Sequence, residues 1–183
     1  SPGTAADWTR RTWVRSPGAW LRYLPATWQV RTVVAPVLAL AIGTASSTSL
    51  AAVDLRTTDA TGCHLTDGRG FEAPTIVLMA GAFREPSLGP ETALKIIDVA
   101  IGAGCDIDEP DALGLSPLNA AILYNEPVLV RRFLEGGANP YAKIISQKKL
   151  LNGNNSFEFL ELLEARDKRR NRQALRKVLG TPR

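Results

Sequence analysis

Residues 114–142 read GLSPLNAAILYNEPVLVRRFLEGGANPYA, and this stretch decides the fold. Ser116 is a typical N-cap residue of a helix. Pro117 suits the first helical position because its missing N–H would have no helical partner there. The apolar residues that follow recur at the spacing of one helical face: Leu118, Ala121 and Ile122. We therefore predict a helix that begins at Pro117 and buries this face.

A second helix follows after a short turn. Pro127 opens it, and Leu129, Phe133 and Leu134 face inward over residues 128–135, while Arg131 and Arg132 lie nearer to solvent. Gly136-Gly137 ends the helix. Because a helix pair of this kind cannot bury its apolar face alone, the hairpin must stack against neighbouring hairpins.

A short element of glycine, a small residue and a polar residue occurs three times: Gly62-Cys63-His64, Gly104-Cys105-Asp106 and Gly137-Ala138-Asn139. The glycines of the first and second copies are 42 residues apart, and those of the second and third copies are 33 residues apart. The first unit is therefore nine residues longer. We assign the extra residues to a loop at residues 84–90, where two prolines and a glycine disfavour helix.

The stretch 114–142 resembles the ankyrin repeat. That repeat runs G-x-T-P-L-H-x-A-A, a turn, a second helix ending in L-L, and then G-A-D. Ser116 stands at the usual Thr position, Asn119 stands at the usual His position, and Gly137-Ala138-Asn139 closes the unit. The resemblance extends over residues 70–108 and fades after residue 145.

The resemblance implies an all-α fold, a stack of helix hairpins with about two to three ankyrin repeats. The repeats occupy residues 52–145. Residues 146–183 are expected to form a degenerate repeat with basic C-terminal capping helices, at about 156–165 and 168–179.

Residues 1–51 are expected to be a leader outside the fold. The apolar run VVAPVLALAI at residues 33–42 is too short for a membrane span, which needs about 20 residues. Arg31 precedes it and small residues follow it, which is the pattern of a secretory signal peptide. We predict cleavage near Ala51 or Ala52 and a periplasmic or secreted product, with membrane contact only through this signal.

Three questions about the leader stay open. One hypothesis places the translation start at Val30, which would give the signal peptide ordinary proportions. The stretch Thr9-Arg10-Arg11 resembles a twin-arginine export signal, although it lies far from the apolar run. An uncleaved membrane anchor is the remaining alternative, and under each of these hypotheses residues 52–183 are exported.

The net charge of +4 comes from an uneven distribution. The leader accounts for +4, and residues 166–183 carry eight basic side chains and one acidic side chain, so residues 52–165 are acidic. A nucleic-acid partner is not expected, because it would require a sustained basic face. We interpret the basic residues near the C-terminus as the polar outer side of the capping unit: Lys168, Arg169, Arg170, Arg172, Arg176 and Lys177. The alternative is an acidic or phosphate-bearing partner.

No residue pattern predicts catalysis, so the chain is not expected to be an enzyme or to take a small-molecule substrate or a cofactor. Its one histidine, His64, directly follows Cys63, and adjacent residues rarely form a nucleophile–base pair. Two cysteines are too few for a closed zinc site, and no metal is expected. The acidic residues at 106–111 lack the central glycine and closing glutamate of a calcium loop.

A disulfide between Cys63 and Cys105 stays open at this point. An oxidising compartment favours it. The two residues occupy equivalent positions of successive units, however, and stacked units lie roughly 10 Å apart, whereas a disulfide needs Cα atoms within about 7 Å.

Ankyrin repeats bind proteins through their hairpin tips and first helices, and this implies a set of contact residues here. The apolar members are Leu113, Leu115, Leu123 and Tyr124, and the acidic members are Asp108, Glu109, Asp111 and Glu72. An exposed apolar cluster with an acidic rim is typical of an interaction site. The alternative is that some of these residues pack under the loop at residues 84–90 or in place of a missing first unit.

We expect an exported module that binds a protein. Small periplasmic ankyrin-repeat proteins of bacteria are similar to this chain, and some neutralise toxic effectors such as phospholipases. The resemblance therefore implies an immunity protein. The alternatives are a general periplasmic scaffold without a toxin partner and, more remotely, an accessory to an envelope enzyme or a stress protein.

Overall fold

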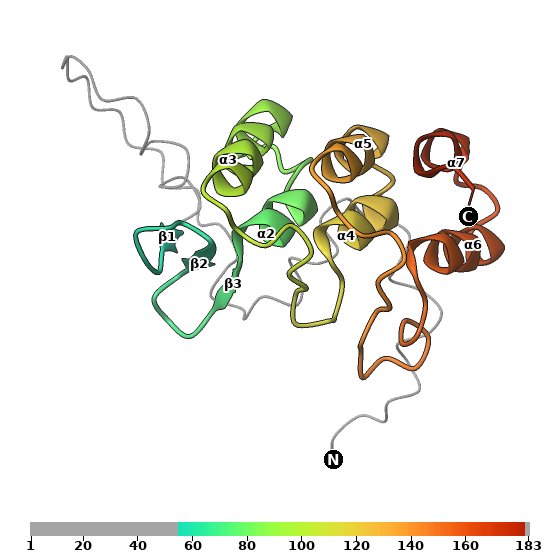
Figure 1. The fold of residues 1–183 in the computed structure, drawn as a ribbon, viewed down its shortest axis with the longest axis horizontal. Coiled ribbons are helices and arrows are strands. Elements are labelled where there is room, and N and C mark those ends of the chain that lie inside the picture. Colours follow the sequence, from blue (N-terminus) through green and yellow to red (C-terminus); the bar gives the residue numbers. More distant parts are fainter. Residues whose placement is uncertain (1–54, 182–183) are drawn as a thin grey trace.

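The computed structural model describes residues 55–181, which form six α-helices and three short β-strands (Figure 1). The predicted leader, its apolar run at residues 33–42 and the cleavage sites at Ala51 and Ala52 lie outside these residues. The elements in chain order are β1 (Arg56–Thr57), β2 (His64–Thr66), β3 (Glu72–Pro74), α2 (Thr75–Gly81), α3 (Pro90–Gly102), α4 (Pro117–Tyr124), α5 (Pro127–Glu135), α6 (Ser156–Arg166) and α7 (Gln173–Leu179).

The helices lie in two rows. Helices α2, α4 and α6 form one row and α3, α5 and α7 form the other (Figure 1). Helix α2 packs against α3 and α4, α4 packs against α5 and α6, and α5 packs against α7. Helix α4 is therefore enclosed by neighbours on three sides, and the core of the described part is built around it.

The central hairpin forms where the sequence predicts it. The Ser116 hydroxyl accepts a hydrogen bond from the N–H of Asn119 at 3.3 Å, and α4 begins at Pro117. Asn125 ends the helix in the left-handed conformation, with φ of 65°. Five of the side chains predicted for the inner faces of this hairpin are fully buried: Leu118, Ala121, Ile122, Leu129 and Phe133. The sixth, Leu134, is half-buried and packs against the core.

The predicted loop between the first two helices occupies residues 82–89 and folds back onto the helices. Phe83 and Leu88 are buried in the core. Arg84 donates two hydrogen bonds of 2.8 Å, from Nε and Nη2, to the carboxylate of Glu126 at the start of α5. Glu126 is buried, and a buried carboxylate is tolerated because it has a paired, hydrogen-bonded partner.

The prediction of an all-α fold is wrong, because residues 55–74 contain a three-stranded antiparallel sheet in the order β1-β2-β3. The fold is mixed. In register, Thr57 lies opposite Leu65, and Leu65 lies opposite Ala73. Leu65 is the buried residue of the middle strand and attaches the sheet to the core.

The two turns of the sheet are built by aspartates. Asp59 Oδ1 accepts hydrogen bonds from the N–H groups of Thr61 and Gly62, at 2.9 and 3.2 Å. Asp67 Oδ1 does the same for Arg69 and Phe71, at 2.7 and 3.0 Å. Each carboxylate thus satisfies backbone donors that the short strands leave unpaired. The strands are only two or three residues long, so their pairing depends on these turns and on the buried side of β2.

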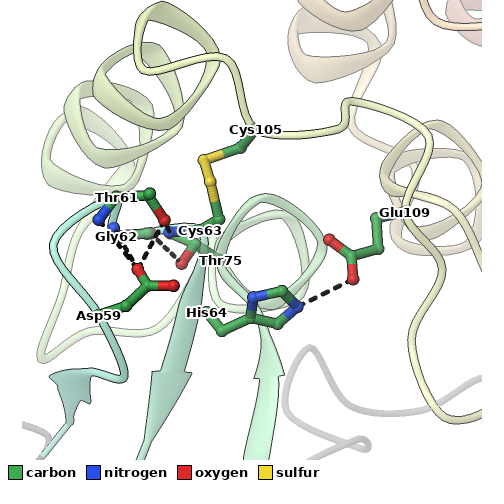
Figure 2. The surroundings of a disulfide bond; sticks show 8 residues. All are labelled: Asp59, Thr61, Gly62, Cys63, His64, Thr75, Cys105 and Glu109. Atoms are coloured by element: carbon green, nitrogen blue, oxygen red, sulfur yellow. Dashed lines mark hydrogen bonds and ion pairs between the residues drawn. A yellow bond between two sulfur atoms is a disulfide. The ribbon is translucent and has the colours of Figure 1, made fainter.

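A disulfide joins Cys63, next to β2, to Cys105, after α3, with a Cα–Cα distance of 5.3 Å (Figure 2). The spacing argument against the bond does not apply, because Cys63 belongs to the sheet and not to a stacked hairpin. Nearby, His64 Nε2 lies 2.8 Å from Glu109 Oε1 (Figure 2). The sheet is therefore attached to residues 105–109 by a covalent bond and by a polar contact.

The C-terminal part departs from prediction in one helix. Helix α6 has a capping box, in which Asn155 and Glu158 each accept from the other's backbone N–H. Helix α7, however, begins at Gln173 and not at residue 168. The residues before it run without helix, and the side chains of Arg170 and Arg172 extend back to carbonyl oxygens at the end of α4.

The prediction that Arg172 lies on the polar outer side of the capping unit is wrong, because Arg172 is only 5% exposed. Of the other basic residues in that prediction, Arg170 is half-buried and Lys168, Arg169, Arg176 and Lys177 are exposed. The basic run is thus partly a solvated face and partly an internal anchor.

We predict that reduction of the disulfide lowers the free energy of unfolding by about 4 kcal/mol, because the bond closes a long loop in the unfolded chain. The sequence separation of 42 residues sets this value. Chemical denaturation with and without reductant measures it. A variant with Cys63→Ser and Cys105→Ser should match the reduced protein and should not respond to reductant. Equal stability of the oxidised and reduced proteins would contradict the prediction.

Candidate protein-binding surface

The hairpin tips lie on one side of the helices. The segment 103–116 joins α3 to α4, the segment 136–155 joins α5 to α6, and both lie on the same side as the sheet (Figure 1). We call these two segments the hairpin-tip surface. It is the region to which the sequence assigns most of the predicted contact residues.

The predicted apolar contact residues are mostly inside the protein. Leu115 is 2% exposed and belongs to the core, so its assignment to a docking face is wrong. Leu113, Leu123 and Tyr124 are half-buried, and both leucines pack against the core. Leu115 is therefore covered completely by other parts of the fold, as the alternative interpretation expects. Leu113, Leu123 and Tyr124 are covered in part.

The predicted acidic rim is largely engaged in internal contacts. The Asp108 carboxylate accepts hydrogen bonds of 3.1 Å from the N–H of Asn139, which ties one hairpin tip to the next. Glu109 contacts His64. Glu72 lies exposed on β3, apart from the tips. These carboxylates join segments of the fold, and their charge is only partly available to a partner.

Asp111 organises the turn before α4. Its Oδ1 accepts hydrogen bonds of 2.9 Å from the N–H groups of Leu113 and Leu115. Burial raises the pKa of this carboxyl above its usual value, and the hydrogen bonds from the backbone oppose that rise. Asp111 thus positions Leu115 for burial and is a structural residue of the turn.

The sequence analysis missed the most exposed apolar side chains of the hairpin-tip surface. They lie in the segment 136–155: Tyr141, Ile145 and Leu150 are 45%, 85% and 41% exposed. The rings of Tyr141 and Phe157 pack with centroids 5.3 Å apart. These side chains are presented by a segment that continues past the recognisable repeat, so no family position pointed to them.

The backbone around Ile145 is held from two sides. Ile144 donates from its N–H to the carbonyl of Asn154 at 2.9 Å, and Gly153 donates to the carbonyl of Ile144 at 2.8 Å. On the other side, the carbonyl of Ile145 lies against Gly114, so closely that a methyl group there would collide with it. Ile145 is therefore an exposed apolar side chain on an ordered backbone.

The local sequence gives only a partial signal for this exposed set. Two isoleucines are adjacent at positions 144 and 145, and in the structure Ile144 is buried and Ile145 is exposed. The sequence does not show which of the two faces the core, because the backbone hydrogen bonds of Ile144 are made with residues 153 and 154.

In residues 55–181, no group of three histidine, cysteine, aspartate or glutamate side chains could hold a metal ion. Over the same range, no helix has the length and apolar character of a membrane span.

Comparisons of the chain with protein-family models, with curated protein sequences and with solved structures found no match.

We predict that Leu115→Ala lowers the free energy of unfolding by about 3 kcal/mol, because it leaves a cavity in the core. The control is Leu150→Ala, which removes the same atoms from a partly exposed position and should cost less than about 1 kcal/mol. Thermal and chemical denaturation compare the two. Equal losses would mean that Leu115 is not a core residue.

A glycine pair tests how closely the two hairpin tips approach. Gly114 and Gly104 both have positive φ, of 83° and 87°, so an alanine is strained at either position. Only at Gly114 would the added methyl group meet a backbone oxygen. We expect Gly114→Ala to destabilise the protein by about 1–3 kcal/mol more than Gly104→Ala. Similar losses in denaturation would show that Ile145 does not rest on Gly114.

Proposed function

We propose that the chain is an exported ankyrin-type repeat protein that acts by stoichiometric binding of another protein. The observation that carries the proposal is Ile145, a side chain that is 85% exposed on a backbone held by Gly114, Gly153 and Asn154. Such an apolar side chain contributes free energy when a partner buries it, and an ordered backbone lowers the entropic cost of binding.

The surroundings of Ile145 fit a protein partner. Tyr141 and Leu150 add further exposed apolar surface in the same segment, and tyrosine is favoured at binding hot spots. Lysines at 143, 148 and 149 lie in the same stretch, and all three are exposed. A protein interface commonly has an apolar centre and a polar rim, and these residues match that arrangement.

The disulfide supports the proposed export. Disulfides form and persist in oxidising compartments and are rare in the cytosol. In residues 55–181 both cysteines are used in this bond. Within a periplasmic location, the specific function we propose is that of an immunity protein that neutralises a secreted toxic effector such as a phospholipase. The resemblance to small periplasmic ankyrin-repeat proteins supplies this last step.

We predict that Ile145→Asp weakens binding of the partner at least about tenfold, because a carboxylate would have to be desolvated in the interface. The matched control is Val99→Asp. Val99 is 72% exposed on α3, in the other row of helices, so it should bind as the wild type does. Both variants should keep the thermal transition of the wild type, because both positions are exposed.

The partner is obtained by affinity purification of the full chain from the periplasm and identified by mass spectrometry. Light scattering then gives the stoichiometry, and an activity assay of the partner tests neutralisation. A one-to-one complex that silences a toxic enzyme supports the immunity function. A non-toxic partner that requires Ile145 would support the scaffold alternative, and equal binding by both variants would reject the proposed surface.

A further inference from the structure

The basic run near the C-terminus lines an open cleft that the proposed protein-binding surface does not include. The cleft lies where α6 passes into α7, has a volume of about 370 Å³, and is lined by Glu164, Asp167, Lys168, Arg170, Asn171, Arg172, Gln173 and Arg176. Four of these side chains are cationic and two are anionic. The cleft therefore carries an excess of positive charge.

Arg172 has an unusual position in this cleft. It is 5% exposed, and its Nη1 and Nη2 donate to the carbonyls of Ile122 and Leu123 at 2.7 and 3.4 Å. Its Nε is buried without a hydrogen-bond partner among the described residues. No carboxylate in residues 55–181 forms an ion pair with it. Buried charges in proteins are normally paired, so this guanidinium is an exception that requires an explanation.

The neighbouring carboxylates compensate the charge of Arg172 only in part. Burial, and next the adjacent positive charge of Arg170, lower the pKa of Arg172 to about 10, although Asp167 and Glu164 oppose that fall. Arg176 forms an ion pair with the carboxylate of Glu164. The Nε atom of Arg176 lies 2.9 and 3.0 Å from the two carboxylate oxygens. Asp167 Oδ1 accepts the N–H of Arg169 at 3.3 Å and is the one remaining anionic group on the lining.

We propose that this cleft binds a phosphate group, either as the free anion or as part of a phospholipid headgroup. Lys168, Arg170 and Gln173 provide donors around the opening, and the buried charge of Arg172 adds a favourable field from beneath. A phosphate group has several oxygens, so it can accept hydrogen bonds from donors at both ends of the turn at residues 167–173. The inference is independent of the protein-binding function, because none of the lining residues belongs to the hairpin-tip surface.

Titration calorimetry of the full chain with inorganic phosphate tests the proposal, at an ionic strength kept constant with chloride. We expect saturable binding. Lys168→Ala should weaken it about tenfold, the loss typical of one charge-assisted hydrogen bond. Lys177→Ala removes the same charge from α7 outside the cleft, so its binding should match that of the wild type. Asp167→Asn should tighten binding, because it removes a negative charge from the lining and keeps an oxygen that can accept from Arg169.

Arg172→Gln tests the buried charge and should also weaken phosphate binding. Circular dichroism identifies any loss of folding in this variant, and Lys168→Ala, at an exposed position, tests the cleft without that risk. Sedimentation with vesicles of phosphatidylcholine and phosphatidylglycerol, against phosphatidylcholine alone, distinguishes the two sources of phosphate. Vesicle binding that requires Lys168 but not Lys177 assigns the lipid headgroup. Absence of both kinds of binding, or equal effects of Lys168→Ala and Lys177→Ala, would overturn the proposal.

Discussion

Burial of helix α4 is the constraint on which the rest of the fold depends. Its neighbours are α2, α5 and α6, and the side chains from Leu118 to Ile122 are almost wholly removed from water. A helix of eight residues is too short to be stable alone, so its stability comes from this packing. Ala120 and Ala121 make the packing feasible, because small side chains let the neighbouring helices come close.

Such burial leaves the polar groups of α4 without water, and several of them are satisfied by specific side chains. Ser116 accepts a backbone N–H at the N-terminus. Within the helix, the buried Asn119 accepts a hydrogen bond of 2.8 Å from the hydroxyl of Ser156, the first residue of α6. At the C-terminus, Arg170 and Arg172 donate to the last carbonyls. The contacts of Ser156, Arg170 and Arg172 connect α4 to α6 and to the C-terminal turn, so packing and polar satisfaction depend on neighbouring elements.

The elements that could be predicted from the sequence are those with local signals. Helices α4, α5 and α6 have caps, prolines at or near their first positions or apolar residues at helical spacing, and all of these lie within a few residues. The sheet has no such signal, since its strands are two or three residues long and pair only after two turns have formed. The start of α7 was missed for a similar reason. Arg172 extends to a carbonyl 50 residues away in the chain, and no local pattern indicates that contact.

The candidate surface was harder to predict than the helices, because exposure is a property of the path of the backbone. Positions carried over from the repeat pattern placed Leu115 outside, whereas the Asp111 turn directs it into the core. The residue that is most exposed, Ile145, lies where the pattern fades. The repeat pattern encodes what the stacked units share, which is mainly their packing. The proposed protein-binding residues lie instead in the segment 136–155, a part that this unit does not share with the others.

The two ends of the stack are closed by different physical means. At the C-terminal end, α7 packs on α5 and is attached through arginines whose charge is expensive to bury. At the N-terminal end, the buried Leu65 attaches the sheet to the core, and the Cys63–Cys105 bond adds a restraint on the unfolded chain. This end thus combines native-state contacts with a covalent restraint on the unfolded state. Reduction of the bond removes that restraint, so its effect falls on the free energy of unfolding and not on the packing of α4 in the folded state.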